Sequence, residues 1–175
     1  MEFFAVTFKQ DKIQKFLKME KKIKIIFKFL IILLISSNLS KAELLEPKSN
    51  INPSDVIRIQ LLGLQKNDYK FKDSGIEQTW NFAHPNNKKV TGPLNNFKRM
   101  IKGDSYQMMI NHLSHTITQL GSGDKWAQFE VIILDKEKIY HKFNWQVEKY
   151  TVEGPLKDCW LTTMVSSPVP LGSSI

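Results

Sequence analysis

Apolar residues in the first half of the chain recur at helical spacing. Ile57, Leu61 and Leu64 lie at intervals of four and three residues, which places them on one face of a helix. Pro53 stands just before this stripe, and proline is common in the first turn of a helix. The pattern predicts a first helix that ends near Asn67.

Two further helices are predicted before the pattern changes. One starts after Ser74 and ends before Pro85, because the residue that precedes a proline is disfavoured in the helical conformation. The other opens at Pro93 and ends at Gly103, since glycine is common just after the C-terminus of a helix. We therefore expect three helices ahead of the second half of the chain.

The second half of the chain alternates between apolar and polar residues, which is typical of strands with one buried face. A polar loop at residues 135–138 joins the two clearest strands, and Pro168 and Pro170 are expected to end regular structure. The predicted strands cover residues 106–120, 126–134, 139–150 and 159–166. Helices followed by an antiparallel meander predict an α+β domain, with the helices packed on one face of a curved sheet of about four strands.

The formal net charge of +8 is concentrated ahead of this domain. Residues 1–42 carry nine lysines and three acidic residues, whereas residues 43–175 carry 16 basic and 14 acidic residues. Binding to nucleic acid needs basic residues gathered against phosphates. A body with a net charge of only +2 therefore argues against a nucleic-acid partner.

The N-terminal segment has the order of a secretory signal. A lysine cluster at residues 21–24 precedes an apolar stretch at residues 25–35, and Ala42 closes a cleavage site with small side chains. We expect export to a periplasm, a lumen or the medium after cleavage near Ala42. The mature chain would then begin at Glu43.

Two alternatives to this interpretation stay open. In the first, the apolar stretch is an uncleaved membrane anchor. This run is shorter than the about 20 apolar residues that a spanning helix needs. In the second, translation starts at Met19, just before the lysine cluster, and residues 1–18 come from a start codon assigned too far upstream. Downstream, residues 43–52 are expected to be a linker, residues 53–170 a single domain and residues 171–175 a tail.

Five short motifs resemble one uncharacterised protein family. They are residues 57–61 (IRIQL), 75–85 (GIEQTWNFAHP), 90–93 (VTGP), 111–115 (NHLSH) and 159–163 (CWLTT). Together they are similar to the family called domain of unknown function 4864, over about residues 53–170. The resemblance implies a cone of the nuclear transport factor 2-like superfamily. It implies no catalytic residue, because that family has no assigned activity and the superfamily hosts many functions.

Histidines are the side chains that most readily move protons near neutral pH. His112 and Glu130 are the candidate acid–base pair of an isomerase- or dehydratase-type enzyme. His112 and His115 are expected on opposite faces of a strand, because their spacing is odd, so no shared metal site is predicted. His84, at the predicted end of the second helix, is expected to interact with the helix dipole.

Aromatic residues are the candidates for a binding site. Trp80, Tyr106, Trp145 and Trp160 are expected to line an apolar pocket at the open end of the helices and sheet, with core packing as the alternative. Cys159 is the single cysteine, so no internal disulfide forms, and we expect a buried thiol.

These observations favour an exported, non-enzymatic protein that binds a small apolar ligand or a protein partner, with a homodimer through the sheet as one arrangement. The alternatives are an acid–base enzyme and a structural dimerisation module. The space between the helices and the sheet would distinguish these functions. A histidine and a carboxylate in contact inside an open space would favour the enzyme. A space filled by side chains would favour the structural module, and an empty apolar space would favour the binding protein. We expect no nucleic acid, cofactor or metal to bind. Contact with a membrane is expected only through the signal segment.

Removal of residues 1–42 is expected to leave a soluble, folded domain, because the predicted core lies wholly within residues 53–170. Circular dichroism and gel filtration of residues 43–175 check this. Aggregation of the shortened chain would contradict the boundary at residue 42.

Overall fold

A computed structural model describes residues 19–22, 24 and 43–173. The chain divides into two units, Met1–Lys41 and Ala42–Ile175, and the second carries the fold described below. The apolar stretch and the cleavage site of the predicted signal lie outside the described residues. Across the residues that are described, no helix combines the length and apolar character needed to cross a membrane.

Within residues 43–173, four α-helices precede the sheet. They are α2 (Pro53–Gln65), α3 (Ser74–Asn81), α4 (Pro85–Thr91) and α5 (Leu94–Ile101), and a short 3₁₀ helix, η1 (Gln107–Met109), follows them. Three of them confirm the helices expected from the sequence. The prediction missed α4, because Pro85 both ends the preceding segment and opens a new helix, where the missing N–H of proline costs nothing.

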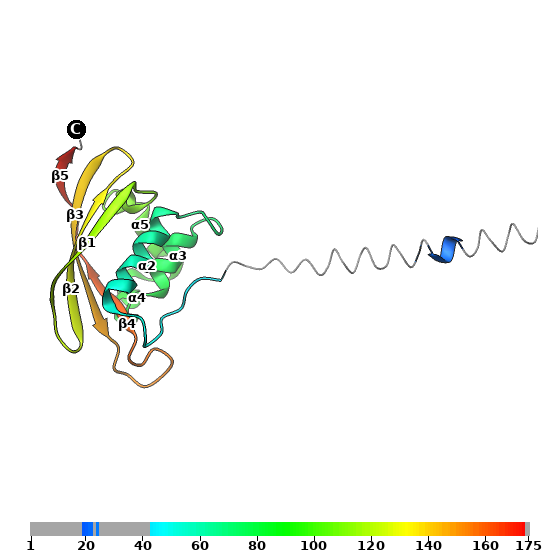
Figure 1. The fold of residues 1–175 in the computed structure, drawn as a ribbon, viewed down its shortest axis with the longest axis horizontal. Helices are drawn as coiled ribbons and strands as arrows, with labels where there is room; N and C mark the ends of the chain where they lie inside the picture. Colours follow the sequence, from blue (N-terminus) through cyan, green and yellow to red (C-terminus); the bar gives the residue numbers. More distant parts are fainter. Residues whose placement is uncertain (1–18, 23, 25–42, 174–175) are drawn as a thin grey trace, which may run out of the picture. The chain divides into compact units, whose positions relative to one another are not determined.

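The second half of the chain forms an antiparallel sheet. Its strands are β1 (Ser114–Ser122), β2 (Trp126–Leu134), β3 (Ile139–Lys149), β4 (Trp160–Val165) and β5 (Val169–Ser173). They are ordered β1-β2-β3-β4, and β5 also pairs with β3. Figure 1 shows a curved sheet with the helices α2 to α5 all on one side of it. The α+β class is therefore confirmed, with five strands in place of about four.

The strand β3 is bordered along one edge by two consecutive strands. Its second half pairs with β4 and its first half with β5, and Ser166 bridges the two by donating its backbone N–H to Asn144 O at 2.9 Å. The expectation that Pro168 and Pro170 end regular structure was wrong. Because β5 is an edge strand, it needs hydrogen bonds on one side only, and proline is tolerated there.

The strand expected at residues 106–120 is shorter than predicted. Residues 106–111 form turns and η1, and β1 begins only at Ser114. Asn111 adopts a positive φ of 56° and donates its backbone N–H to Leu64 O at 2.9 Å. This contact with α2 redirects the chain before the sheet starts, and the weak alternation of the segment gave no sign of it.

The alternation in β2 and β3 divides the sheet into a buried and an exposed face, as predicted. On β2, Ala127, Phe129, Val131 and Ile133 are buried, while the residues between them are half-buried or exposed. The buried face meets the apolar stripe of α2, which includes Ile57, Leu61 and Leu64. Burial of these side chains between helices and sheet forms one core.

The helices α2 and α3 cross at very short range. A Cβ atom on Gly75 would lie 2.0 Å from the carbonyl oxygen of Gly63, so only glycine fits there. Asn67 fastens the crossing, because its carbonyl accepts the Gly75 N–H at 2.8 Å and its side-chain oxygen accepts the Ile76 N–H at 3.1 Å. The backbones themselves thus set the distance between the two helices.

Gly75→Ala is expected to lower the free energy of unfolding by about 3 kcal/mol, because the added methyl group must push two backbones apart. Gly103→Ala is the matched control, since its Cβ would meet only the carbonyl oxygens of Met100 at 3.3 Å and Arg99 at 3.5 Å. Urea denaturation measures both, and the control should stay within about 1 kcal/mol of the parent. Equal stability of the two variants would contradict the close crossing.

Candidate functional site

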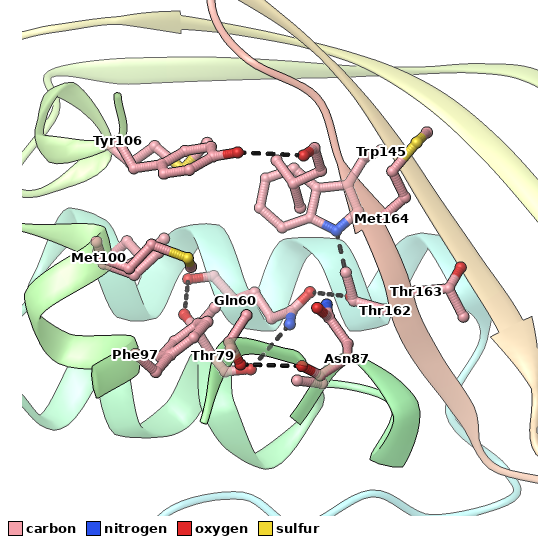
Figure 2. A pocket seen from close by; sticks show the side chains of 16 residues that line it. Gln60, Thr79, Asn87, Phe97, Met100, Tyr106, Trp145, Thr162, Thr163 and Met164 are labelled. Atoms are coloured by element: carbon pink, nitrogen blue, oxygen red, sulfur yellow. Dashed lines mark hydrogen bonds between the residues drawn. The ribbon is translucent and has the colours of Figure 1, made fainter. Parts of the chain in front are cut away.

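A cavity of about 210 Å³ lies between the helices and the strands β3 and β4. Every helix from α2 to α5 contributes to its wall, and Figure 2 shows the side chains converging from the helices and the sheet. The lining residues are Gln60, Leu64, Thr79, Ala83, Asn87, Thr91, Phe97, Met100, Ile101, Tyr106, Met109, Trp145, Thr162, Thr163, Met164 and Val165. The wall is mostly apolar, with a few amide and hydroxyl groups.

A chain of buried hydrogen bonds crosses one wall of the cavity (Figure 2). The Trp145 indole Nε1–H donates to Thr162 Oγ1 at 3.2 Å, and the Thr162 hydroxyl donates to Gln60 Oε1 at 2.6 Å. Gln60 Nε2 in turn donates to the carbonyl oxygen of Thr79 at 3.0 Å. All four residues are buried, so the chain fixes β3, β4, α2 and α3 to one another through polar atoms.

The structure brings two of the four predicted aromatic residues to this cavity. Trp145 and Tyr106 line it, and the Tyr106 hydroxyl donates to Val165 O at 3.4 Å. Trp80 is half-buried outside the wall, with its ring centroid 5.0 Å from that of Phe97 and the Lys88 ammonium over its face. Trp160 also lies outside the cavity wall and packs against the core. The ligand-binding role predicted for Trp80 and Trp160 has no support from this cavity.

The cavity wall carries almost no charge. Among its lining residues Tyr106 alone is ionisable, and no carboxylate, imidazole, ammonium or guanidinium group reaches it. General acid–base chemistry needs a group that titrates near the working pH at hydrogen-bond distance from the substrate. The Tyr106 hydroxyl is therefore the one group of the wall that titrates, and the other polar groups are neutral amides and hydroxyls.

The candidate pair of His112 and Glu130 is not brought together. His112 is buried on the helical side, beside Met109. Glu130 alternates with the buried residues of β2, and its Oε2 lies 3.8 Å from the Lys142 ammonium. No hydrogen bond or ion pair joins the two side chains in the described part of the chain.

His112 contacts His115 instead, which corrects the expectation of opposite faces. His112 precedes β1, so strand alternation does not govern the pair, and its Nε2 lies 2.7 Å from His115 Nδ1. His112 Nδ1 lies 2.7 Å from the carbonyl oxygen of Met109, which only accepts, so His112 carries its hydrogen on Nδ1. Its Nε2 then accepts from His115. Burial lowers the pKa of His112 to about 4, with a smaller effect from His115 in the same direction.

Two further predictions about single residues have opposite outcomes. His84 is not at the C-terminus of α3 but is the N-cap of α4, where its Nδ1 accepts the Asn86 N–H at 3.1 Å. Burial lowers the pKa of His84, against an opposing effect of Glu148. Cys159 is buried as expected, at 2 % exposure, and burial raises the pKa of its thiol.

Gln60 is a residue of the cavity for which the sequence holds a signal that the expectations above do not include. Gln60 lies on the apolar stripe of α2 beside Ile57 and Leu64, and a polar residue at such a position has to find a buried partner. Its partner Thr162 is 102 residues away in the chain, and no local pattern links the two.

Comparisons with known proteins add no assignment to this geometry. No family model, no curated protein and no solved structure matches the chain. Among the residues that the structure describes, no group of three or more His, Cys, Asp or Glu side chains is placed to hold a metal ion.

Stability is expected to fall as the pH decreases from 7 to 5. The folded state holds His112 neutral with a pKa of about 4, whereas in the unfolded chain His112 takes up a proton near its ordinary pKa of 6.5. This linkage contributes about 2 kcal/mol over that interval. Urea denaturation at both pH values measures it. His112→Gln should lose this contribution, whereas His84 and His115, whose pKa values burial also lowers, should keep theirs. An unchanged slope in the variant would contradict the assignment.

Proposed function

We propose that the protein binds a small, uncharged, mostly apolar molecule in the cavity between its helices and its sheet, and that it does so without catalysing a reaction. The observation that carries the proposal is the composition of the wall, which combines apolar side chains with amide and hydroxyl groups and has Tyr106 as its single ionisable side chain. Small-molecule sites generally have this composition, with a few polar groups that fix orientation.

The size of the cavity limits the ligand. A volume of about 210 Å³ lies below the roughly 300–1,000 Å³ of typical ligand sites, and above the roughly 150 Å³ of an engineered cavity that binds benzene. A molecule with one ring and a short substituent fits this range. Larger ligands would require the wall to move.

The polar groups of the wall favour a single hydrogen-bonding substituent on that ligand. The Gln60 amide nitrogen has two hydrogens, and one of them is used in the bond to Thr79 O. Asn87, on α4, adds a second amide close to Gln60 and Thr162 (Figure 2). A hydroxyl or carbonyl oxygen on the ligand would accept from these groups, whereas a carboxylate would find no cation in the wall.

The resemblance to domain of unknown function 4864 and the nuclear transport factor 2-like cone belong to the same proposal. Helices gathered on one side of a curved antiparallel sheet support the cone (Figure 1). Four of the five motifs that carry the resemblance supply residues to the cavity wall, for example Gln60, Thr79, Thr91 and Thr162.

Export after cleavage near Ala42 and a homodimer through the exposed face of the sheet complete the proposal. Native mass spectrometry of the protein isolated from its own host would report the processed N-terminus, the subunit count and any retained ligand together.

Binding is tested with p-cresol, an uncharged ring with one hydroxyl, and with p-toluate, its charged counterpart. The expected dissociation constant for p-cresol is on the order of 0.1–1 mM, in keeping with so few atoms. Binding of p-toluate should be at least roughly tenfold weaker, because a carboxylate would be desolvated without a partner. The Trp145 indole resonance in ¹H–¹⁵N spectra provides the local readout. Equal affinity for the two probes would overturn the proposal.

Asn87→Phe places a ring at the cavity wall and should weaken p-cresol binding at least roughly tenfold. Asn86→Phe is the matched control, because Asn86 is the exposed neighbour on the same helix and does not line the cavity. Similar affinity in the two variants would place the binding site elsewhere.

A further inference from the structure

The helix α4 forms part of the wall of the main cavity, the one between the helices and the sheet described above. Asn87 and Thr91 line this cavity, and they lie one turn apart on the same face of the helix. Lys89, on the far side, and its neighbour Val90 are exposed, Val90 at 86 %. A single helix therefore separates this side of the cavity from water.

Few contacts hold α4 on the rest of the domain. It is the one α-helix of residues 43–173 that has no buried residue. In the described part of the chain, a single hydrogen bond joins residues 85–91 to another helix or strand, from the Lys88 ammonium to Asn81 O at 3.2 Å. The same ammonium lies 5.5 Å from the centroid of the Trp80 ring. With seven residues, α4 is also too short to be stable alone, because isolated helices below about 12 residues are marginal in water.

The chain is fixed on both sides of α4. Ahead of it, the His84 N–H donates to Thr162 O at 2.8 Å. Beyond it, α5 is anchored in the core by its buried residues Phe97 and Ile101. Between α4 and α5, Gly92 adopts a φ of 79°, a conformation that favours glycine. The helix thus lies between two fixed points, and a glycine at one end absorbs changes in backbone angle.

The other walls of the cavity are held more firmly. The helices α2 and α3 are locked by the close crossing at Gly75, and β3 and β4 are paired within the sheet. The 3₁₀ helix η1 has Met109 buried at 1 % exposure, and the chain just after it is bonded to α2 through the Asn111 N–H. Elements with few buried contacts open at the smallest cost in free energy. Of the walls of this cavity, α4 is the one that fits this description.

We propose that α4 is a lid of the main cavity, which opens as a unit about its two ends and lets the ligand in and out. The inference rests on the function proposed above and adds how that site is reached. It also assigns the part of the wall that a ligand larger than the cavity displaces. Lys88 is the latch, since its contacts with Asn81 and Trp80 break when the lid opens.

Opening of the lid is tested without ligand, by native-state hydrogen exchange of the full chain. The α4 amides, such as the Lys88 N–H that donates to His84 O at 2.9 Å, should exchange through a local opening. Their rates should therefore not change with urea below the unfolding transition. Amides of α2 should exchange at least roughly a hundredfold more slowly, with rates that rise with urea. Equal protection and equal urea dependence of α4 and α2 would overturn the lid.

Passage of the ligand is tested with two variants at Val90, which is exposed and does not line the cavity. Glycine is disfavoured relative to alanine in a helix by a factor of about five. The probe p-cresol should enter and leave Val90→Gly about fivefold faster than Val90→Ala, with the same affinity, because a lid changes both rates alike. Line-shape analysis of the Trp145 indole resonance measures the two rates. If α4 is lost in Val90→Gly, Val90→Ala should still be about two- to threefold slower than the parent.

Asn95→Gly and Asn95→Ala are the matched control on α5, because Asn95 is exposed and lies outside the cavity wall. This pair should leave both rates unchanged. Equal rates in the Val90 variants, or an equal response to the Asn95 pair, would overturn the lid. If p-cresol does not bind the parent, the function proposed for the cavity fails, and hydrogen exchange in the free chain still decides whether α4 opens by itself.

Discussion

The hydrogen bonds of Thr162 hold the helices on the sheet. Its backbone N–H donates to Phe82 O and its carbonyl accepts the His84 N–H, both at 2.8 Å, so β4 binds the junction of α3 and α4 directly. Its side chain bonds Gln60 on α2 and Trp145 on β3. One buried residue on the sheet therefore fixes three helices, and every member of the set has a partner, as buried polar groups require.

The main cavity is a consequence of this arrangement. The close crossing at Gly75 holds α2 and α3 together, while Thr162 holds that pair to the sheet at a distance set by hydrogen bonds. The side chains of α5 and η1 do not fill the remaining space. Because Gln60, Thr162 and Trp145 bond mainly to one another, their polar atoms stabilise the wall.

The histidines show how position in the fold decides the chemistry of one residue type. Burial keeps His112 neutral by lowering its pKa, an effect that the Met109 carbonyl opposes and His115 reinforces. His84 uses a lone pair to cap α4. His141 is held by a carboxylate and retains an unpartnered nitrogen.

Short-range patterns in the sequence determined the elements whose geometry is local. The alternation of residues 126–134 fixed the buried face of β2, and the stripe of Ile57 and Leu61 fixed that of α2, because side-chain direction repeats with the backbone period. The start of β1 escaped prediction because the contact between Asn111 and α2 decides it. The strand β5 also escaped prediction, because its two prolines are tolerated only at the edge of a sheet, and the sequence does not show which strand lies at an edge.

Only the tertiary structure decided the candidate sites. Tyr106 and Trp145 could be selected as cavity residues because their large apolar rings carry a polar tip, as side chains of ligand sites often do. Nothing local separated them from Trp80, which packs between helices. Gln60 and Thr162 meet across 102 residues, and their bond exists because the packing of α2 on β4 brings them within 2.6 Å. The sequence by itself determined which residues face inward, and the packing of distant elements determined which of those residues meet.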